Sequence, residues 1–284
     1  MLYFSYANGS VEMGKGPLLI IGGGEDKGEE SEILGRFVEL VSQHGHDPRV
    51  GVVTTASTEG DAVFTVYSRA FHRLGVQWVE PLNLNHRRSA SDPDLCCRLE
   101  SLAGIFFGGG DQLRITSMLG GSHFHRKLLA RHGQGLVVAG TSAGASMMSL
   151  TMIVEGDARE SPTKNTVKMA TGMGLWTGAV IDQHFSQRGR IGRLLSAVAQ
   201  NPEILGVGLD ENTAIEVCLE ESTLRVWGEA TVTVIDGRQI EETNASESED
   251  NQPLALTGVT LHVLPRGYGM DLHTRRPFLV SNTL

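Results

Sequence analysis

Short apolar runs alternate with amphipathic stretches along the first half of the chain. Residues 17–21, 50–54, 76–82, 104–107 and 136–139 read as buried strands. Two of the intervening segments carry apolar residues at helical spacing: Ile33, Leu34, Phe37, Val38 and Val41 in the first, and Val63, Val66, Tyr67, Ala70 and Leu74 in the second. Alternating strands and helices predict an α/β fold with a doubly wound, mostly parallel sheet.

The pattern changes near residue 204. Residues 213–218, 223–227, 231–235 and 259–264 are rich in β-forming residues and predict an antiparallel meander that closes one side of the domain. At 284 residues the chain can bury one large core, so we expect a single domain made of an N-terminal extension (1–16), a doubly wound core (17–203) and a β-rich C-terminal part (204–284). Residues 243–252 are polar and acidic, and we expect a solvated loop without a binding role there.

Charge and composition narrow the classes of partner. The net charge is −9 and no basic block or aromatic stripe is present, so we expect no nucleic-acid partner. No apolar run reaches the length of a membrane span, and the N-terminus has no cationic segment of a secretory signal, so we expect a cytoplasmic protein without a membrane partner. Cys96, Cys97 and Cys218 are odd in number and lack metal-ligand spacing, so we expect neither a disulfide framework nor a metal or cofactor.

A possible nucleophile follows the fifth expected strand. Gly140, Ser142 and Gly144 match the Gly-x-Ser-x-Gly pattern, directly after residues 136–139 and before an Ala/Met-rich run. A serine on a sharp strand-to-helix turn needs small neighbours because the backbone is crowded there. Its hydroxyl then projects above the sheet, and the amide of Ala143 can donate to a developing oxyanion. An ordinary Gly/Ser turn is the alternative, and the strand before the motif favours the nucleophile.

Three loops of small residues share this position in the fold. Residues 22–26 and 108–112 follow expected strands, as the serine motif does. Ligand sites of doubly wound sheets lie at the carboxyl ends of the parallel strands. The sequence therefore predicts one site at this edge of the sheet.

A nucleophilic serine requires a base and a group that orients the base. Among ten histidines, we select His184, because it follows a short apolar segment and lies in a densely polar stretch, 181–193. We expect His44, His46, His72 and His132 to be structural or solvated. Asp210 and Glu211 are both candidates for the orienting acid; in an extended segment they would face opposite sides, so only one should reach the imidazole.

Three arginines form a cationic cluster in an otherwise acidic chain: Arg188, Arg190 and Arg193. The spacing of Arg190 and Arg193 places both on one face if a helix has begun there. Such a cluster is either a solvated helix end or a site at which guanidinium groups bind carboxylates.

Five segments occur in the order seen in cyanophycinases: residues 23–27, 107–112, 140–146, 182–185 with the three arginines, and 208–214. Cyanophycinases are serine peptidases related to the α-aspartyl dipeptidase (peptidase E) family. The chain resembles them over residues 18–236, and the Asp-Gln-His-Phe segment with its arginines is the most specific part of the match.

The resemblance implies a flavodoxin-like, class I glutamine-amidotransferase-like fold with Ser142 as nucleophile, His184 as base and Glu211 as the orienting acid. It implies an exopeptidase that hydrolyses the poly-aspartate backbone of cyanophycin, in which arginine is linked to each β-carboxyl, to β-Asp-Arg dipeptides. It also suggests a homodimer.

On this interpretation, the oxyanion hole consists of the amides of Ala143 and of either Gly109 or Gly110. The side chains expected to bind cyanophycin or a β-linked Asp-Arg peptide are Gln112, Asp182, Gln183, Arg188, Arg190 and Arg193. The alternatives are an aspartyl dipeptidase similar to peptidase E and a non-catalytic ligand-binding protein on the same fold; the intact serine, histidine and glutamate argue against the second.

Overall fold

The computed structural model describes residues 6–7, 10–11, 14–45, 47–156, 161–164, 166–249 and 252–280. Its helices are α1 (Glu32–Ser42), α2 (Gly60–Arg73), α3 (Pro93–Arg98), α4 (Gln112–Leu119), α5 (His123–His132), α6 (Ala143–Ser146) and α7 (Ile191–Gln200), with 3-10 turns at Ser89–Ser91 and Ser186–Arg188. Its strands are β1 (Tyr6–Ala7), β2 (Ser10–Val11), β3 (Leu18–Ile21), β4 (Arg49–Val53), β5 (Trp78–Pro81), β6 (Gly104–Phe107), β7 (Val137–Thr141), β8 (Thr151–Gly156), β9 (Val167–Thr171), β10 (Ala179–Gln183), β11 (Leu205–Leu209), β12 (Thr213–Cys218), β13 (Thr223–Gly228), β14 (Thr231–Asp236), β15 (Thr260–Pro265), β16 (Tyr268–Asp271) and β17 (Arg276–Leu279).

The central sheet contains the five strands predicted for the first half of the chain. Its order is β17-β16-β13-β12-β3-β7-β6-β4-β5, and the neighbours from β3 to β5 are parallel. Alternate residues of β3 face opposite sides, so Leu18 and Ile20 belong to one buried cluster while Leu19 and Ile21 belong to another. A strand buried on both faces is typical of a parallel sheet covered by helices.

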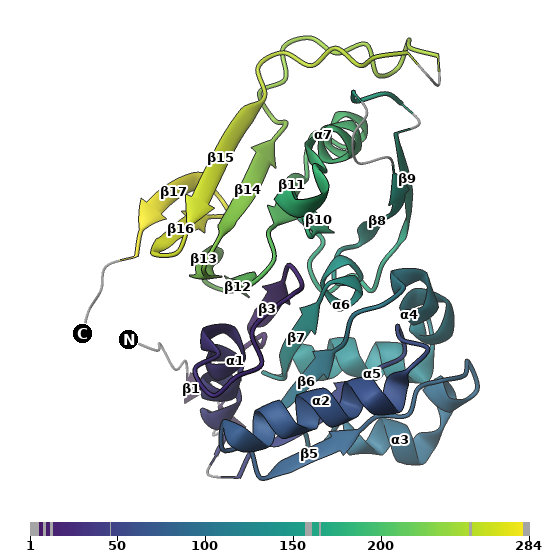
Figure 1. Cartoon of the computed structure of the whole chain (residues 1–284), viewed down its shortest axis with the longest axis vertical. Coiled ribbons are helices and arrows are strands. Elements are labelled where there is room, and N and C mark those ends of the chain that lie inside the picture. The colour runs from purple at the N-terminus through teal and green to yellow at the C-terminus, as the bar shows by residue number, and fades with distance from the viewer. Residues whose placement is uncertain are drawn as a thin grey trace.

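Helices cover both faces of this sheet, as the sequence predicts (Figure 1). The apolar residues of α1 and α2 pack on one face, and those of α4 and α5 pack on the other. Three of these helices begin at a side-chain cap. In each, a serine or aspartate oxygen accepts a hydrogen bond from a backbone amide of the first turn that has no partner within the helix. The caps are Ser31 for α1, Asp111 for α4 and Ser122 for α5. The predicted α/β, doubly wound fold is confirmed.

The C-terminal strands divide between two sheets, which differs from the single meander expected. β12, β13, β16 and β17 extend the central sheet, whereas β14 and β15 join β10 and β11 in a second sheet of order β10-β11-β14-β15. The chain changes sheet at Gly228, which has a φ of 96° and lies so close to Asn212 that a side chain would overlap its carbonyl oxygen. The periodicity of apolar residues indicates each strand but not the strand with which it pairs, so the division into two sheets could not be predicted from the sequence.

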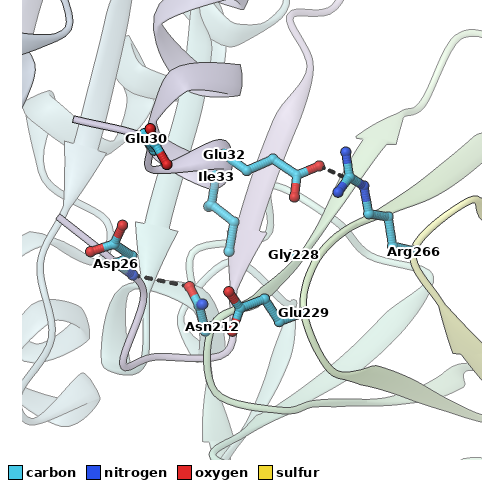
Figure 2. Close-up of a pocket in the computed structure, with 8 residues that line it drawn as sticks. All are labelled: Asp26, Glu30, Glu32, Ile33, Asn212, Gly228, Glu229 and Arg266. Carbon is cyan, nitrogen blue, oxygen red and sulfur yellow. Dashed lines mark hydrogen bonds and ion pairs between the residues drawn. The ribbon is translucent and has the colours of Figure 1, made fainter. Parts of the chain in front are cut away.

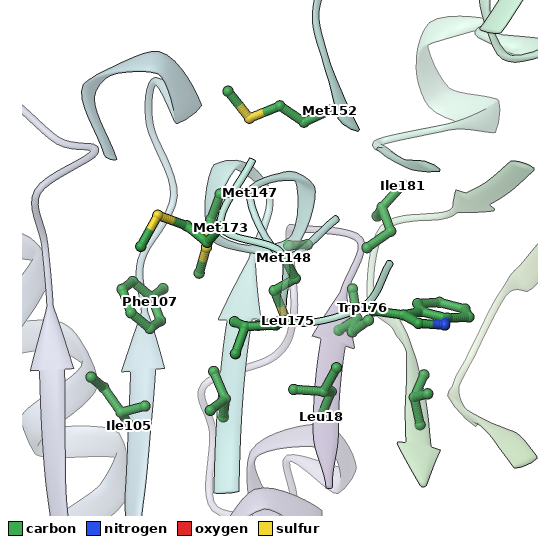
Figure 3. Close-up of a cluster of buried hydrophobic side chains, with 14 of the residues drawn as sticks. Leu18, Ile105, Phe107, Met147, Met148, Met152, Met173, Leu175, Trp176 and Ile181 are labelled. Carbon is green, nitrogen blue, oxygen red and sulfur yellow. The ribbon is translucent and has the colours of Figure 1, made fainter. Parts of the chain in front are cut away.

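A methionine-rich core lies beneath the short helix α6 (Figure 3). Met147, Met148 and Met173 are fully buried there, and Trp176 is 4% exposed. The unbranched thioether side chains fill irregular space, which suits the junction between the central sheet and the second sheet. The turn that carries Ser142 therefore packs on buried apolar side chains.

The acidic segment 243–252 is mostly exposed in its described residues, 243–249 and 252. Asn244 nevertheless holds the two arms of this loop together, since its Oδ1 accepts from the amide of Ala255 at 2.8 Å and its Nδ2 donates to the carbonyl of Pro253 at 3.2 Å. Residues 250 and 251 lie outside the described residues.

Phe106 lies at the centre of the aromatic cluster between α1, α2 and the central sheet, so its substitution tests this part of the core. It is fully buried, with ring centroids 4.5 Å from Tyr67, 5.4 Å from Phe71 and 5.9 Å from Phe37. Phe106→Ala leaves a cavity and should lower the free energy of unfolding by about 3–5 kcal/mol in urea denaturation. Leu129→Ala, on the exposed side of α5, should change it by less than about 1 kcal/mol; equal effects would contradict this assignment of the core.

Candidate active site

Ser142 lies at the turn between β7 and α6 with a strained backbone. Its φ is 54° and its ψ is −110°, a region that non-glycine residues rarely adopt. Its amide donates to the carbonyl of Ile21 at 3.0 Å, which ties the turn to β3. Gly140 and Gly144 leave the necessary space, because a Cβ on Gly140 would overlap the carbonyl of Gly144, and one on Gly144 would overlap that of Phe107.

His184 directly follows β10 and faces this serine. Its Nε2 lies 3.0 Å from Ser142 Oγ, and its own φ is 46°. The loop after β3 holds the imidazole from behind: the amide of His184 donates to the carbonyl of Gly22 at 2.9 Å, and a side chain at Gly23 would overlap the ring. The position needs glycine because the backbone approaches the ring so closely.

Of the two candidate acids, Glu211 contacts the imidazole. Its Oε1 lies 2.6 Å from His184 Nδ1. Asp210 faces the other way and is buried, where its Oδ1 accepts from the amide of Ser186 at 2.9 Å and its Oδ2 accepts from Thr231 Oγ1 at 2.8 Å. The two neighbours face opposite sides, although residues 211 and 212 form a turn and not the extended segment expected from the sequence. Ser142, His184 and Glu211 form one hydrogen-bonded chain.

The glycine loop after β6 borders the serine hydroxyl. A Cβ built on Gly109 would lie 3.4 Å from Ser142 Cβ and 3.8 Å from its Oγ. Gly110, with a φ of 139°, lies instead against the carbonyl of Ala56. Of the two glycines, Gly109 therefore lies nearer to Ser142. Its amide is the better candidate to donate to an oxyanion together with the amide of Ala143, the first residue of α6.

The other histidines considered in the sequence lie elsewhere. His44 and His72 are exposed, and His72 Nδ1 contacts the carbonyl of Val76 at 2.8 Å. His132 is 3% exposed, and burial lowers its pKa to about 4, so it is neutral at pH 7. His46 lies outside the described residues.

Asp182 pairs inside the protein with two of the arginines that we expected to bind substrate. Its Oδ2 accepts from Arg193 Nε at 2.6 Å, its Oδ1 accepts from Arg193 Nη2, and Arg190 Nη1 lies 3.3 Å from the same Oδ1. All three side chains are 9% exposed or less. Direct contact of Asp182 and Arg193 with substrate stays a prediction; in the structure the two side chains pair with each other, which offsets the cost of burying both charges.

Arg190 retains a hydrogen-bond donor that the fold does not use. Its Nη1 also donates to the carbonyl of Gln183, but its Nε is buried without a partner in the described part of the chain. Burial lowers the pKa of Arg190 to about 10, although Asp182 favours its charged form. A buried donor without an acceptor is costly, because nothing replaces the hydrogen bond that it makes to water in the unfolded chain.

The other residues predicted to bind substrate differ in their exposure and in the hydrogen bonds that they already make. Arg188 is exposed, at the end of the 3-10 turn after His184. Gln183 is buried, with its Oε1 3.5 Å from Ser142 Oγ. Gln112 lies at the start of α4, and its Nε2 donates to the carbonyls of Ile153 at 2.9 Å and Val154 at 3.2 Å.

Sequence reasoning assigned no role to Glu25, although it lies in the loop after β3. The structure buries it to 3% exposure and surrounds it with donors: Tyr67 hydroxyl at 2.5 Å, Thr141 Oγ1 at 2.6 Å and Lys27 Nζ at 3.3 Å. Burial, reinforced by this carboxylate, raises the pKa of Tyr67, which stays a neutral donor. A carboxylate directly after three glycines at the carboxyl end of a strand is the signal that could have drawn attention to it.

An acidic pocket of about 340 Å³ is lined in part by Asp26 of this loop (Figure 2). Its carboxylates are those of Asp26, Glu30, Glu32 and Glu229. Arg266 Nε already pairs with Glu32 Oε1 at 2.9 Å, and Asn212 Oδ1 accepts from the amide of Asp26 at 3.0 Å. Within the described residues, no group of three or more His, Cys, Asp or Glu side chains converges in a way that could hold a metal ion.

Comparison with known proteins identifies the family. Residues 18–225 match the model of peptidase family S51. The chain belongs to this family. It is 36% identical over 263 residues to the cyanophycinase of Synechococcus elongatus, a match that covers 92% of the chain and 81% of the relative. It is also 36% identical over 261 residues to the cyanophycinase of Geminocystis herdmanii, covering 92% and 95% of the two chains.

A solved structure supports the fold. The crystal structure of a peptidase from an acI-B1 Actinobacterium superposes with a TM-score of 0.67 over 92% of this chain and 98% of the other, at 19% identity. This S51 chain has, in its described residues, no helix whose length and apolarity would suffice to span a bilayer.

The internal pairing of Asp182 makes a prediction for stability. Asp182→Asn leaves two buried guanidinium groups without their carboxylate and should lower the free energy of unfolding by about 3–5 kcal/mol in urea denaturation. Glu155→Gln breaks an exposed pair with Lys168 and should leave the midpoint unchanged. If the Asp182→Asn protein were as stable as the wild type but had a raised KM, a direct contact between Asp182 and the substrate would be the better interpretation.

Proposed function

We propose that this S51 peptidase is a cyanophycinase, a serine exopeptidase that cleaves the poly-aspartate backbone of cyanophycin into β-Asp-Arg dipeptides. The observation that carries the proposal is the hydrogen-bonded chain of Ser142, His184 and Glu211 in a protein 36% identical to cyanophycinases along 92% of its length. Such a chain suits acyl transfer, because each member activates or orients the next.

In the proposed mechanism, Ser142 Oγ attacks the carbonyl of the aspartyl backbone while His184 Nε2 takes its proton. Glu211 holds the imidazole with Nδ1–H directed at its carboxylate and stabilises the imidazolium that forms. The amides of Ala143 and Gly109 donate to the tetrahedral oxyanion. His184 then gives the proton to the leaving amine, and water repeats the sequence on the acyl-enzyme.

Two guanidinium groups in the segment that follows His184 support a substrate rich in carboxylates. Arg188 is exposed, and Arg190 has an unpartnered Nε within the described residues. In the proposal these two guanidinium groups bind substrate carboxylates, while Arg193 holds Asp182 and thereby positions Arg190. Gln183 and Gln112 supply side-chain oxygens for the polar branches.

The family resemblance leaves a second specificity, that of an aspartyl dipeptidase, so the substrate is the point to test. Purified protein is incubated with cyanophycin and, separately, with α-aspartyl dipeptides, and the products are separated by mass. Release of β-Asp-Arg supports the proposal, whereas cleavage of aspartyl dipeptides alone would indicate a peptidase E-like activity. We also propose that the protein is a cytoplasmic homodimer. Light scattering of the purified protein measures its molar mass and so tests whether it is a dimer.

Ser142→Ala tests the nucleophile. The substitution removes one hydroxyl, so the protein should fold with an unchanged melting temperature but lose at least about three orders of magnitude in kcat on cyanophycin. Near-normal turnover would refute the serine mechanism. A chelator added to the wild type is the control and should leave the rate unchanged.

Glu211→Gln and Asp210→Asn separate the two neighbouring acids. The amide that replaces the Glu211 carboxylate can hold the ring but favours the wrong tautomer, so kcat should fall by about three to four orders of magnitude with little loss of stability. Asp210→Asn should instead lower stability, because an amide nitrogen replaces an oxygen that accepts from Ser186 or Thr231. The reverse ranking in kcat would assign the orienting role to Asp210.

A further inference from the structure

A cavity of about 380 Å³ lies beside α2 and reaches the glycine loop that borders the nucleophile. Its walls come from Ala62, Val63, Val66 and Tyr67 of α2, from Gly109 and from Lys27. Val66 is 45% exposed although it is apolar, so it presents its side chain to whatever occupies this space. The cavity is therefore apolar with one cation at its edge.

Gly109 connects this cavity with the site of reaction. It lines the cavity, and a Cβ on it would lie 3.4 Å from Ser142 Cβ. A group held in the cavity would thus belong to a substrate whose carbonyl lies against Ser142. The volume of the cavity is within the range of small-molecule sites, about 300–1,000 Å³, and the cavity is open to solvent on one side, as a branch that projects from a polymer requires.

The buried network of Glu25 gives the cavity a rigid frame. Glu25 accepts from the Tyr67 hydroxyl at 2.5 Å, and Lys27 Nζ, which donates to the carbonyl of Glu25 at 3.0 Å, lies 5.3 Å from the centre of the Tyr67 ring. The ammonium is consequently fixed over the aromatic wall. The ammonium already pairs with Glu25 Oε1 at 3.3 Å, but the side chain of Lys27 is 33% exposed, so a second carboxylate can approach it from outside.

We propose that this cavity is a second substrate subsite, which holds one arginine branch of the polymer: the aliphatic stem lies against Val66 and Tyr67, and the α-carboxylate of the arginine pairs with Lys27. This inference rests on the proposed function, because it assigns a part of cyanophycin to a place in the protein.

The chemistry of the branch fits the chemistry of the cavity. Every arginine of cyanophycin is joined through its α-amine and keeps a free α-carboxylate, which an ammonium attracts. Its three methylene groups can cover apolar surface while the guanidinium reaches water. Lys27 repels a guanidinium, so the branch must enter with its carboxylate toward Lys27 and its guanidinium away from it. Lys27 on this side and Arg190 beside Gln183 would then give Ser142 a cation for a branch on each flank of the scissile bond.

The experiment compares two substrates on the same variants. One is an oligomer of β-Asp-Arg with free arginine carboxylates, and the other is the same oligomer with arginine carboxamides. Lys27→Gln should lower kcat/KM on the free acid by about tenfold, mainly through KM, and should change kcat/KM on the carboxamide by less than about twofold. Lys27→Arg should retain most of the activity on the free acid, because it keeps the charge.

Two further variants serve as control and as an independent test. Lys127 has a comparable side-chain exposure of 34% but pairs with Glu100 on the opposite face of the sheet, so Lys127→Gln should leave both substrates unaffected. Val66→Asp places a competing carboxylate beside Lys27 without disturbing Glu25, and it should also weaken binding of the free acid selectively.

The outcomes separate the two proposals. Equal losses on both substrates would show that Lys27 acts through Glu25 on the turn of Ser142 and would overturn the subsite. Wild-type rates on both substrates for Lys27→Gln and Val66→Asp would overturn it as well. A wild-type protein that cleaves neither oligomer would refute the proposed function, and this inference with it.

Discussion

The backbone of Ser142 is the constraint around which the site is organised. A serine with a φ of 54° is strained, and it keeps this conformation only because its surroundings allow no other. The amide of Ser142 is bound to the carbonyl of Ile21, and the turn on either side lacks room for any side chain at Gly140 and Gly144. The strain places the hydroxyl above the carboxyl ends of the strands, where β3, β6 and β7 each end in a loop of small residues.

The strain must be offset by stability elsewhere, and two features beneath the turn supply it. The methionine-rich core under α6 buries apolar surface directly beneath the turn. On the other side, the buried Glu25 accepts from Thr141, the residue just before the serine, and from Tyr67 on α2. A carboxylate in this position is tolerated because it is fully hydrogen-bonded and paired with Lys27.

What the sequence predicts well is local. The parallel strands, the amphipathic helices α1 and α2 and the turn at Ser142 each leave a pattern within a dozen residues. The pairing of β14 with β11 rather than β13 leaves no such pattern, because strand pairing is decided by contacts far apart in the chain. For the same reason, the sequence identified a cationic cluster at Arg190 and Arg193 but did not show that Asp182 would neutralise part of it, since that depends on how β10 and α7 pack.

The position of Glu211 in the site depends on how the two sheets are joined. Residues 210–212 connect β11 of the second sheet to β12 of the central sheet, and each residue has a different anchor. Asp210 is bound to Thr231 in the second sheet, while the amide of Asn212 donates to the carbonyl of Gly23 in the loop after β3. Glu211 lies between these anchors, so its distance to His184 is determined by both sheets at once. His184 is held in the same way, because it follows β10 of the second sheet while its amide donates to the carbonyl of Gly22 after β3, so both partners of this contact are attached to the two sheets at their junction.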